Sequence, residues 1–178
     1  MSKALKKYLR APYYPSMKMP SLTDELQSGS ARGVTVLAAA FADSSLEYVL
    51  SSHISKTTTE TEKKALFSDQ GPLSTFSAKI KIVRAFGIIG PKTTHDLELI
   101  RTIRNAMAHS NRVLTFRTQV VVELCGEFIS GKSIDNFSEL PAQDQFVKGA
   151  NAVTHHLAWK GNSGGYKKPG ESPYRDLD

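Results

Sequence analysis

The chain of 178 residues lacks several features that would narrow its function at once. Its single cysteine, Cys125, excludes an internal disulfide and fits a reducing compartment. No apolar run reaches the roughly 20 residues that span a bilayer, because the longest, from Val34 to Ala42, is followed by Asp43. No apolar stretch follows the basic N-terminus, so we expect no signal peptide. These absences favour a soluble, cytoplasmic protein without a membrane segment.

Cofactor and metal motifs are also scarce. The sequence has no dinucleotide-binding fingerprint, and its histidines and its cysteine do not stand at metal-ligand spacing. His155 and His156 are adjacent, so their side chains point in different directions on a helix, and we expect both on the surface. Cys125 falls on a predicted apolar helix face, where we expect a buried, inert thiol. The sequence therefore predicts neither a cofactor nor a metal.

One phosphate-loop pattern is present, formed by Gly126, four residues, and then Gly131-Lys132-Ser133. It matches the Walker A spacing, and Val120-Val121-Val122 upstream resembles the strand that precedes such a loop. Only 45 residues follow Ser133, and Pro141 interrupts the helix that should begin there. Too little chain remains for the parallel sheet that surrounds this loop, so we favour a glycine turn that ends a helix.

The net charge of +6 suggests a nucleic-acid partner, but the excess positive charge lies at the ends of the chain. Residues 1–19 hold five basic and no acidic residues, together with three tyrosines, whereas residues 20–159 are balanced. We therefore divide the chain into a basic arm (residues 1–20), a helical domain (21–160) and a flexible tail (161–178). The alternatives for the arm are a solubilising segment or a nucleic-acid contact made by Lys3, Lys6, Lys7 and Arg10.

The middle of the chain has the periodicity of helices. Apolar residues recur three and four positions apart, as at Leu46, Leu50 and Ile54, and Ser30 stands where an N-cap is needed. The pattern predicts an all-α fold, a compact bundle of about six helices. We expect helices over residues 21–28, 30–54, 74–88, 94–108, 118–129 and 142–159, and a linker or a short exposed helical turn over 57–64.

Local signals refine two of these helices. Ser74 and Thr94 are the expected N-caps, and Gly90-Pro91 is the expected end of the helix that begins at Ser74. Asp96 would then lie in a first turn, where a carboxylate is favourable to the helix dipole. Lys79 is expected on an exposed helix face.

The segment from Ile88 to Ala108 has the order helix, glycine-containing turn, helix. That order also occurs in helix-turn-helix DNA-binding units. Here the second helix would begin His95-Asp96-Leu97-Glu98, whose carboxylates would repel phosphates where a recognition helix meets DNA. We therefore expect no sequence-specific DNA reading by this element.

The most informative stretch is Arg104-Asn105 followed by His109, at the end of a predicted helix. If two copies of this helix met in a homodimer, two arginines and two histidines would line one cleft. Histidine can transfer the proton of a ribose 2′-hydroxyl, and arginine stabilises charge on phosphoryl oxygens, so the cleft would suit phosphodiester cleavage. In the structural alternative, Arg104 pairs with Asp43 or Glu47, while Asn105 and His109 bind backbone groups at the helix end.

These residues resemble the arginine, four residues, histidine motif of the HEPN superfamily of helical domains. Many HEPN domains are metal-independent endoribonucleases that act as dimers. The resemblance implies catalytic roles for Arg104, Asn105 and His109, with RNA as the substrate.

A second set of landmarks extends over about residues 28–129. They are Arg32-Gly33, Ala38-Ala39-Ala40-Phe41, Leu46-Glu47, Leu66-Phe67, the block from Gly71-Pro72-Leu73-Ser74 to Ala78-Lys79-Ile80, Ala85-Phe86-Gly87-Ile88-Ile89, Asp96-Leu97, Ile100-Arg101, Ile103-Arg104-Asn105, Ala108-His109-Ser110 and Cys125. This stretch resembles the mannitol operon repressor family. The resemblance implies a compact helical regulator, labelled a transcriptional repressor, that acts through a protein partner and shares a helical core with HEPN domains.

The block that begins at Gly71 has two interpretations. It is either a joint between loop and helix or an anion site, in which the hydroxyls of Ser74 and Ser77 bind at a helix N-terminus near Arg104 and His109. A regulator is the first functional hypothesis, and an endoribonuclease is the alternative. The candidate binding residues are Arg32, Ser74, Ser77, Lys79 and Ser110.

Overall fold

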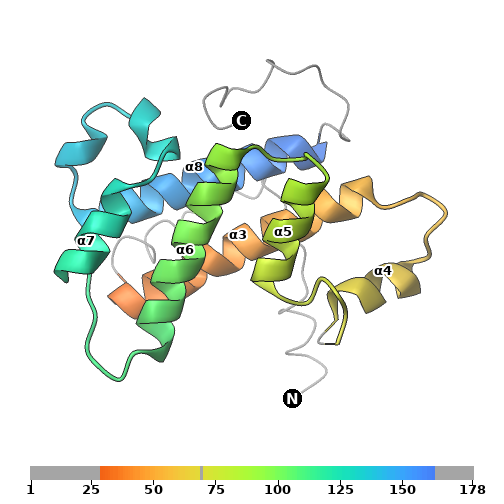
Figure 1. Ribbon diagram of the computed structural model, residues 1–178, viewed down its shortest axis with the longest axis horizontal. Helices are drawn as coiled ribbons and strands as arrows, with labels where there is room; N and C mark the ends of the chain where they lie inside the picture. The colour runs from red at the N-terminus through yellow and green to blue at the C-terminus, as the bar shows by residue number, and fades with distance from the viewer. Residues whose placement is uncertain (1–28, 69, 163–178) are drawn as a thin grey trace.

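The computed structural model describes residues 29–68 and 70–162. Within these ranges the chain forms six α-helices and two short 3-10 helices and no strand, which confirms the all-α prediction (Figure 1). The basic arm, the expected helix over residues 21–28 and nearly all of the tail lie outside the described residues. The elements are α3 (Ala31–His53), α4 (Glu60–Phe67), α5 (Phe76–Ala85), α6 (Pro91–His109), α7 (Gln119–Gly126), η1 (Ser130–Ser133), η2 (Phe137–Glu139) and α8 (Ala142–Asn162).

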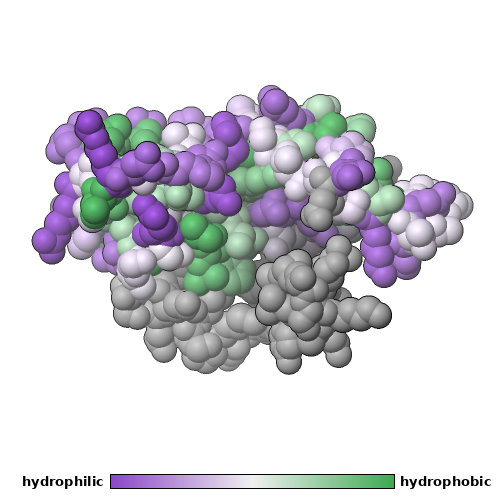
Figure 2. Space-filling model, turned by 90° about the horizontal axis from the view of Figure 1, so that it is seen from below, coloured by the Kyte–Doolittle hydropathy of each residue, from purple (hydrophilic) through white to green (hydrophobic). Residues whose placement is uncertain are grey.

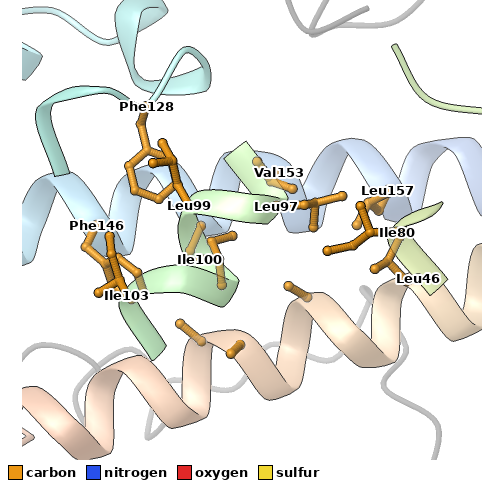
Figure 3. Packing of buried hydrophobic residues seen from close by; sticks show 14 of the residues in the cluster. Leu46, Ile80, Leu97, Leu99, Ile100, Ile103, Phe128, Phe146, Val153 and Leu157 are labelled. Carbon is orange, nitrogen blue, oxygen red and sulfur yellow. The ribbon is translucent and has the colours of Figure 1, made fainter. Parts of the chain in front are cut away.

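The long helices α3 and α8 pack against each other and form the base of the bundle, and α6 crosses in front of them (Figure 1). The buried side chains of α3 recur at helical spacing, so this helix turns one apolar stripe towards its neighbours. Leu46 of α3, Ile80 of α5, Leu97 and Ile100 of α6 and Leu157 of α8 meet in one core (Figure 3). Because α6 contacts α3, α5, α7 and α8, it is the central element of the fold.

The helix α3 passes a test of length and composition for a membrane span. It has 23 residues, and a window within it reaches a mean hydropathy of 1.3. Half of that window is buried inside the bundle. Core helices meet the same criterion, and α3 packs as one, against α5, α6 and α8.

The junction between α5 and α6 differs from the prediction. The helix α5 ends at Ala85 because Gly87 adopts a left-handed conformation with φ of 66°, and the N–H of Ile88 donates to the carbonyl of Val83. This is a Schellman termination, which glycine accommodates without steric strain. Pro91 then begins α6 as its first residue, where its missing N–H costs nothing. Expecting Gly90-Pro91 to end the preceding helix was therefore wrong.

The N-cap predictions had mixed outcomes. Ser30 caps α3, as expected, and its hydroxyl accepts from the N–H of Gly33 at 3.1 Å. The N-cap of α5 is Thr75 and not Ser74, since the hydroxyl of Thr75 accepts from the N–H of Ala78. Ser74 lies in the turn before α5, where its backbone N–H donates to the carbonyl of Gly71. The prediction of Thr94 as a cap was also wrong, because α6 begins three residues before it.

Of the two alternatives for residues 57–64, a linker or a short exposed helical turn, the structure has the helical one, since α4 begins at Glu60 and continues to Phe67. Thr59 and Glu62 form a reciprocal capping box, a signal that the sequence already carried as Thr-x-x-Glu. Two hydrogen bonds lower the pKa of the Glu62 carboxyl. The larger contribution comes from the Thr59 hydroxyl and the smaller from the Thr59 backbone N–H. Since the pKa of Glu62 is lower in the folded state, this stabilisation is present at neutral pH and is lost as the pH falls through the lowered value.

Candidate functional site

The C-terminal end of α6 holds Arg104, Asn105 and His109. Arg104 and Asn105 are partly buried, and Arg104 Nη1 donates to Asn105 Oδ1 at 2.9 Å. His109 is exposed in the last turn, where a basic side chain suits the helix dipole. Within one chain, therefore, the arginine is oriented by its neighbour and the histidine faces solvent.

The same end of α6 meets the start of α3. Arg32 Nη2 donates to the backbone carbonyl of Ser110, the residue that follows α6, at 3.2 Å. A guanidinium here satisfies a carbonyl that the helix leaves without a partner. The structure thus brings Arg32 and Ser110 together, beside the stretch that contains Arg104 and His109.

Ser74, Ser77 and Lys79 belong to a different neighbourhood, at the start of α5. Among the described residues no hydrogen bond joins Ser74 or Ser77 to Arg104 or His109. The anion site that would combine both groups stays a prediction.

Lys79 is buried, with 2% of its surface exposed, which contradicts its expected place on an exposed face. Its Nζ lies 2.9 Å from Asp43 Oδ2 and 3.0 Å from Glu47 Oε2 of α3, and 5.8 Å from the centre of the Phe67 ring. The two carboxylates that the structural alternative assigned to Arg104 are therefore taken by Lys79. This charge cluster joins α3 to α5 and gives Lys79 a structural role.

The exposed residues of α6 form a stripe without lysine or arginine. They are Pro91, His95, Thr102, Ala106 and His109. Arg101 is bound within the helix to Glu98 at 2.6 Å. A DNA recognition helix usually has a basic, polar exposed face, whereas the basic residues Lys92, Arg101 and Arg104 of α6 are only partly exposed.

Asp96 is the residue that sequence reasoning misjudged most. It is fully buried, and its carboxylate accepts hydrogen bonds from the backbone N–H groups of Ile129 at 2.9 Å and Ser130 at 2.7 Å. Ser130 Oγ in turn donates to the carbonyl of Gly149 in α8. Asp96 therefore caps η1 and ties α6 to α8, so it is not the first-turn, dipole-stabilising residue of the prediction.

Comparison with known proteins identifies the family. The model of the mannitol repressor family (MtlR) matches residues 56–156, more than half of the chain. The chain belongs to the mannitol repressor family. The match runs from just before α4 into α8, so it includes α6 and its C-terminal end.

Two solved structures share the fold of this mannitol repressor relative. One is MtlR in its complex with HPr from Escherichia coli, with a TM-score of 0.58 and 18% identity over 79% of this chain and 96% of that one. The other is a possible transcriptional regulator, YggD, from Shigella flexneri, with a TM-score of 0.61 and 12% identity over 81% of this chain and 96% of that one. No curated protein matches the chain. None of these comparisons supports the HEPN interpretation of Arg104 and His109, which stays a prediction.

The Walker-like segment of this family member has a packing explanation. Residues 130–133 form the 3-10 helix η1 after the helix α7, and residues 120–122 lie in α7 and not in a strand. A Cβ atom on Gly131 would fall closer than 3.0 Å to the ring of Phe137, so this glycine lets the ring close over η1. Lys132 and Ser133, which would hold phosphate and magnesium in a true phosphate loop, are exposed.

We expect Gly131→Ala to lower the free energy of unfolding by about 2 kcal/mol, because the added methyl group overpacks the site against Phe137. Lys132→Ala, at the exposed neighbouring position, should change it by less than about 0.5 kcal/mol. Urea denaturation of both variants and the wild type measures the difference. Equal stability of Gly131→Ala and the wild type would contradict the packing explanation.

The remaining candidates are structural. His156 is fully buried and stacks on Trp159 with ring centres 6.4 Å apart, so the expectation that it lies on the surface was wrong, whereas His155 is exposed as expected. Residue 156 shares the inward face of α8 with Val153 and Leu157. Cys125 is fully buried, as predicted, and burial raises the pKa of its thiol to about 12. No group of three or more His, Cys, Asp or Glu side chains suited to a metal ion occurs in the described part of the chain.

Proposed function

We propose that this chain is a regulatory protein of the mannitol repressor type, which controls transcription through a protein partner and not through a DNA-reading helix. The observation that carries the proposal is the family match over residues 56–156. The likeness to MtlR in its complex with HPr supports a protein as the partner. HPr from the same cell is therefore the partner to test first.

The geometry of α6 supports a partner other than DNA. The helix-turn-helix candidate over residues 88–108 places α6 in the recognition position. The exposed stripe of that helix has no lysine or arginine, and Asp96 at its N-terminal half is buried as a cap for η1. A protein partner can account for regulation without a DNA-binding surface.

The test combines binding with transcription. We expect HPr, titrated into the full-length chain in a calorimeter, to form a one-to-one complex with a dissociation constant on the order of micromolar. We also expect deletion of the gene to change the transcript levels of a small set of operons. A deletion strain with an unchanged transcript profile would refute the regulatory function, whereas absence of HPr binding alone would refute only that choice of partner.

We further propose that the protein works in the cytoplasm as a homodimer. The proposal of a cytoplasmic location is supported by the family and by the single, buried cysteine. Sedimentation equilibrium of the full chain should give twice the mass of the 19.5 kDa chain. RNA binding by the basic arm stays a prediction, since the arm lies outside the described residues.

A further inference from the structure

The stretch from the middle of α6 to the middle of α7 has an unusual distribution of charge. Residues 99–122 contain four arginines, no lysine and no acidic residue. One of them, Arg101, is engaged in an ion pair within α6. The other three, Arg104, Arg112 and Arg117, stand between the last turns of α6 and the start of α7, and Arg32 from α3 binds the carbonyl of Ser110 in the same stretch. We name the resulting set the arginine patch: Arg32, Arg104, Arg112 and Arg117.

Local hydrogen bonds hold two guanidinium groups of the arginine patch and the backbone at the other two arginines. The Arg104 guanidinium is oriented by Asn105, and that of Arg32 is held by its bond to the α6 end. In the loop between α6 and α7, the backbone N–H of Arg112 donates to Ser110 Oγ, and the backbone N–H of Arg117 donates to the hydroxyl of Thr115. A loop backbone that is already held in place loses less conformational entropy when a partner binds.

Two guanidinium groups of the patch are available to a partner. Arg112 and Arg117 are exposed, and neither belongs to the ion pairs formed among residues 29–68 and 70–162. Val113 is 89% exposed and Val120 is 55% exposed, the first and second most exposed valines of that part of the chain. Figure 2 shows hydrophilic and apolar side chains next to each other at the end of the molecule that carries α7 and this loop.

We propose that the arginine patch, together with Val113 and Val120, is the docking surface for a protein that presents a cluster of carboxylates. The inference rests on the proposed regulatory function and assigns its partner a chemistry. Arg112 and Arg117 are exposed and belong to none of the ion pairs among the described residues, so they complement carboxylates, which bind guanidinium in a two-pronged geometry. Exposed valines beside arginines give the surface an apolar centre with a polar rim, as in protein interfaces.

A protein fits this surface better than RNA does. Single-stranded nucleic acid is bound by arginine or lysine together with exposed aromatic rings on which bases stack. Phe116 is the only Phe, Tyr or Trp in residues 99–122, and it is buried, with 8% of its surface exposed. Valine offers apolar contact without a stacking platform, so the patch selects for the carboxylates and apolar groups of a protein.

The experiment starts in the cell. A photo-crosslinking amino acid, p-benzoylphenylalanine, replaces Val113 in the full-length protein, and the crosslinked species is identified by mass spectrometry. The identified protein is purified, and its dissociation constant is measured with the wild type and with Arg112→Glu combined with Arg117→Glu. Lys81→Glu combined with Lys148→Glu is the matched control, because both lysines are exposed and lie on α5 and α8.

We expect a crosslink to a protein whose contact region is rich in Asp and Glu. The arginine variant should weaken binding about 30-fold, and the lysine control should change it by less than about twofold. Changing the partner's carboxylates to lysine should restore binding to the arginine variant. A crosslink to RNA, to a second copy, or within the same chain overturns the proposal, and so do the absence of any crosslink and equal binding by all variants.

The result separates this inference from the proposed function. If deletion of the gene leaves the transcripts unchanged but an acidic protein binds through the patch, the docking surface stands and the regulatory function falls. If transcripts change and the arginine variant regulates like the wild type, the docking surface falls and the regulatory function stands.

Discussion

Replacement of Asp96 by alanine should lower the free energy of unfolding by about 4 kcal/mol, the largest effect that we expect for one carboxylate among residues 29–68 and 70–162. The carboxylate accepts from two backbone N–H groups, those of Ile129 and Ser130, and it is fully buried. A hydrogen bond to a charged group contributes about 1.5–3 kcal/mol, and alanine leaves both donors without an acceptor. Urea denaturation followed by circular dichroism measures the loss.

Two further variants identify the cause. Asp96→Asn keeps one carbonyl acceptor but directs an NH₂ group at the second donor, so it should cost about 2 kcal/mol. Asp135→Ala removes a carboxylate that is exposed between η1 and η2, and it should cost less than about 0.5 kcal/mol. If Asp96→Ala were as mild as Asp135→Ala, solvent or a backbone shift would be satisfying the two N–H groups, and the capping role would be wrong.

The contrast between α3 and Asp96 shows which features a sequence reveals. The helix α3 was predicted closely because its apolar residues recur every three or four positions and Ser30 caps it, and both signals are local. Asp96 was predicted to be a first-turn residue because the helix start was placed at Thr94, and the two backbone N–H groups that it binds are more than 30 positions away. A hydrogen bond between distant segments leaves no periodic pattern in the chain.

Some errors came from local signals that were present. Gly87 stands one residue after the C-cap of α5, the usual place of a helix-terminating glycine, and Thr59 with Glu62 matches the capping-box pattern. In the candidate site, too, some features could be found from local sequence and others depend on packing. The sequence singled out Arg104 and His109, but the contact of Arg32 with Ser110 depends on how α3 meets α6. The placement of those two helices is a property of the packed core.

The second large effect on stability is expected at Lys79, which is buried and not exposed as predicted. We expect Lys79→Met to lower the free energy of unfolding by about 3 kcal/mol. Methionine keeps the apolar length that lies near Phe67 but removes the ammonium group shared by Asp43 and Glu47. This loss of stability is at the low end for breaking a buried charge cluster. The side chains of Asp43 and Glu47 are 34% and 46% exposed, so their carboxylates retain some contact with water.

The reason for a large loss is the position of Asp43. Its Oδ1 atom is buried without a hydrogen-bond partner among the described residues, so Oδ2 and Lys79 provide its compensation. Adding Asp43→Asn to Lys79→Met should therefore recover about 1 kcal/mol, because the unpaired charge is removed. Lys81→Met, on the exposed face of the same helix, is the control and should change stability by less than about 0.5 kcal/mol. If Lys79→Met behaved like that control, the cluster would be a water-screened pair, and the packing of apolar residues alone would hold α3 against α5.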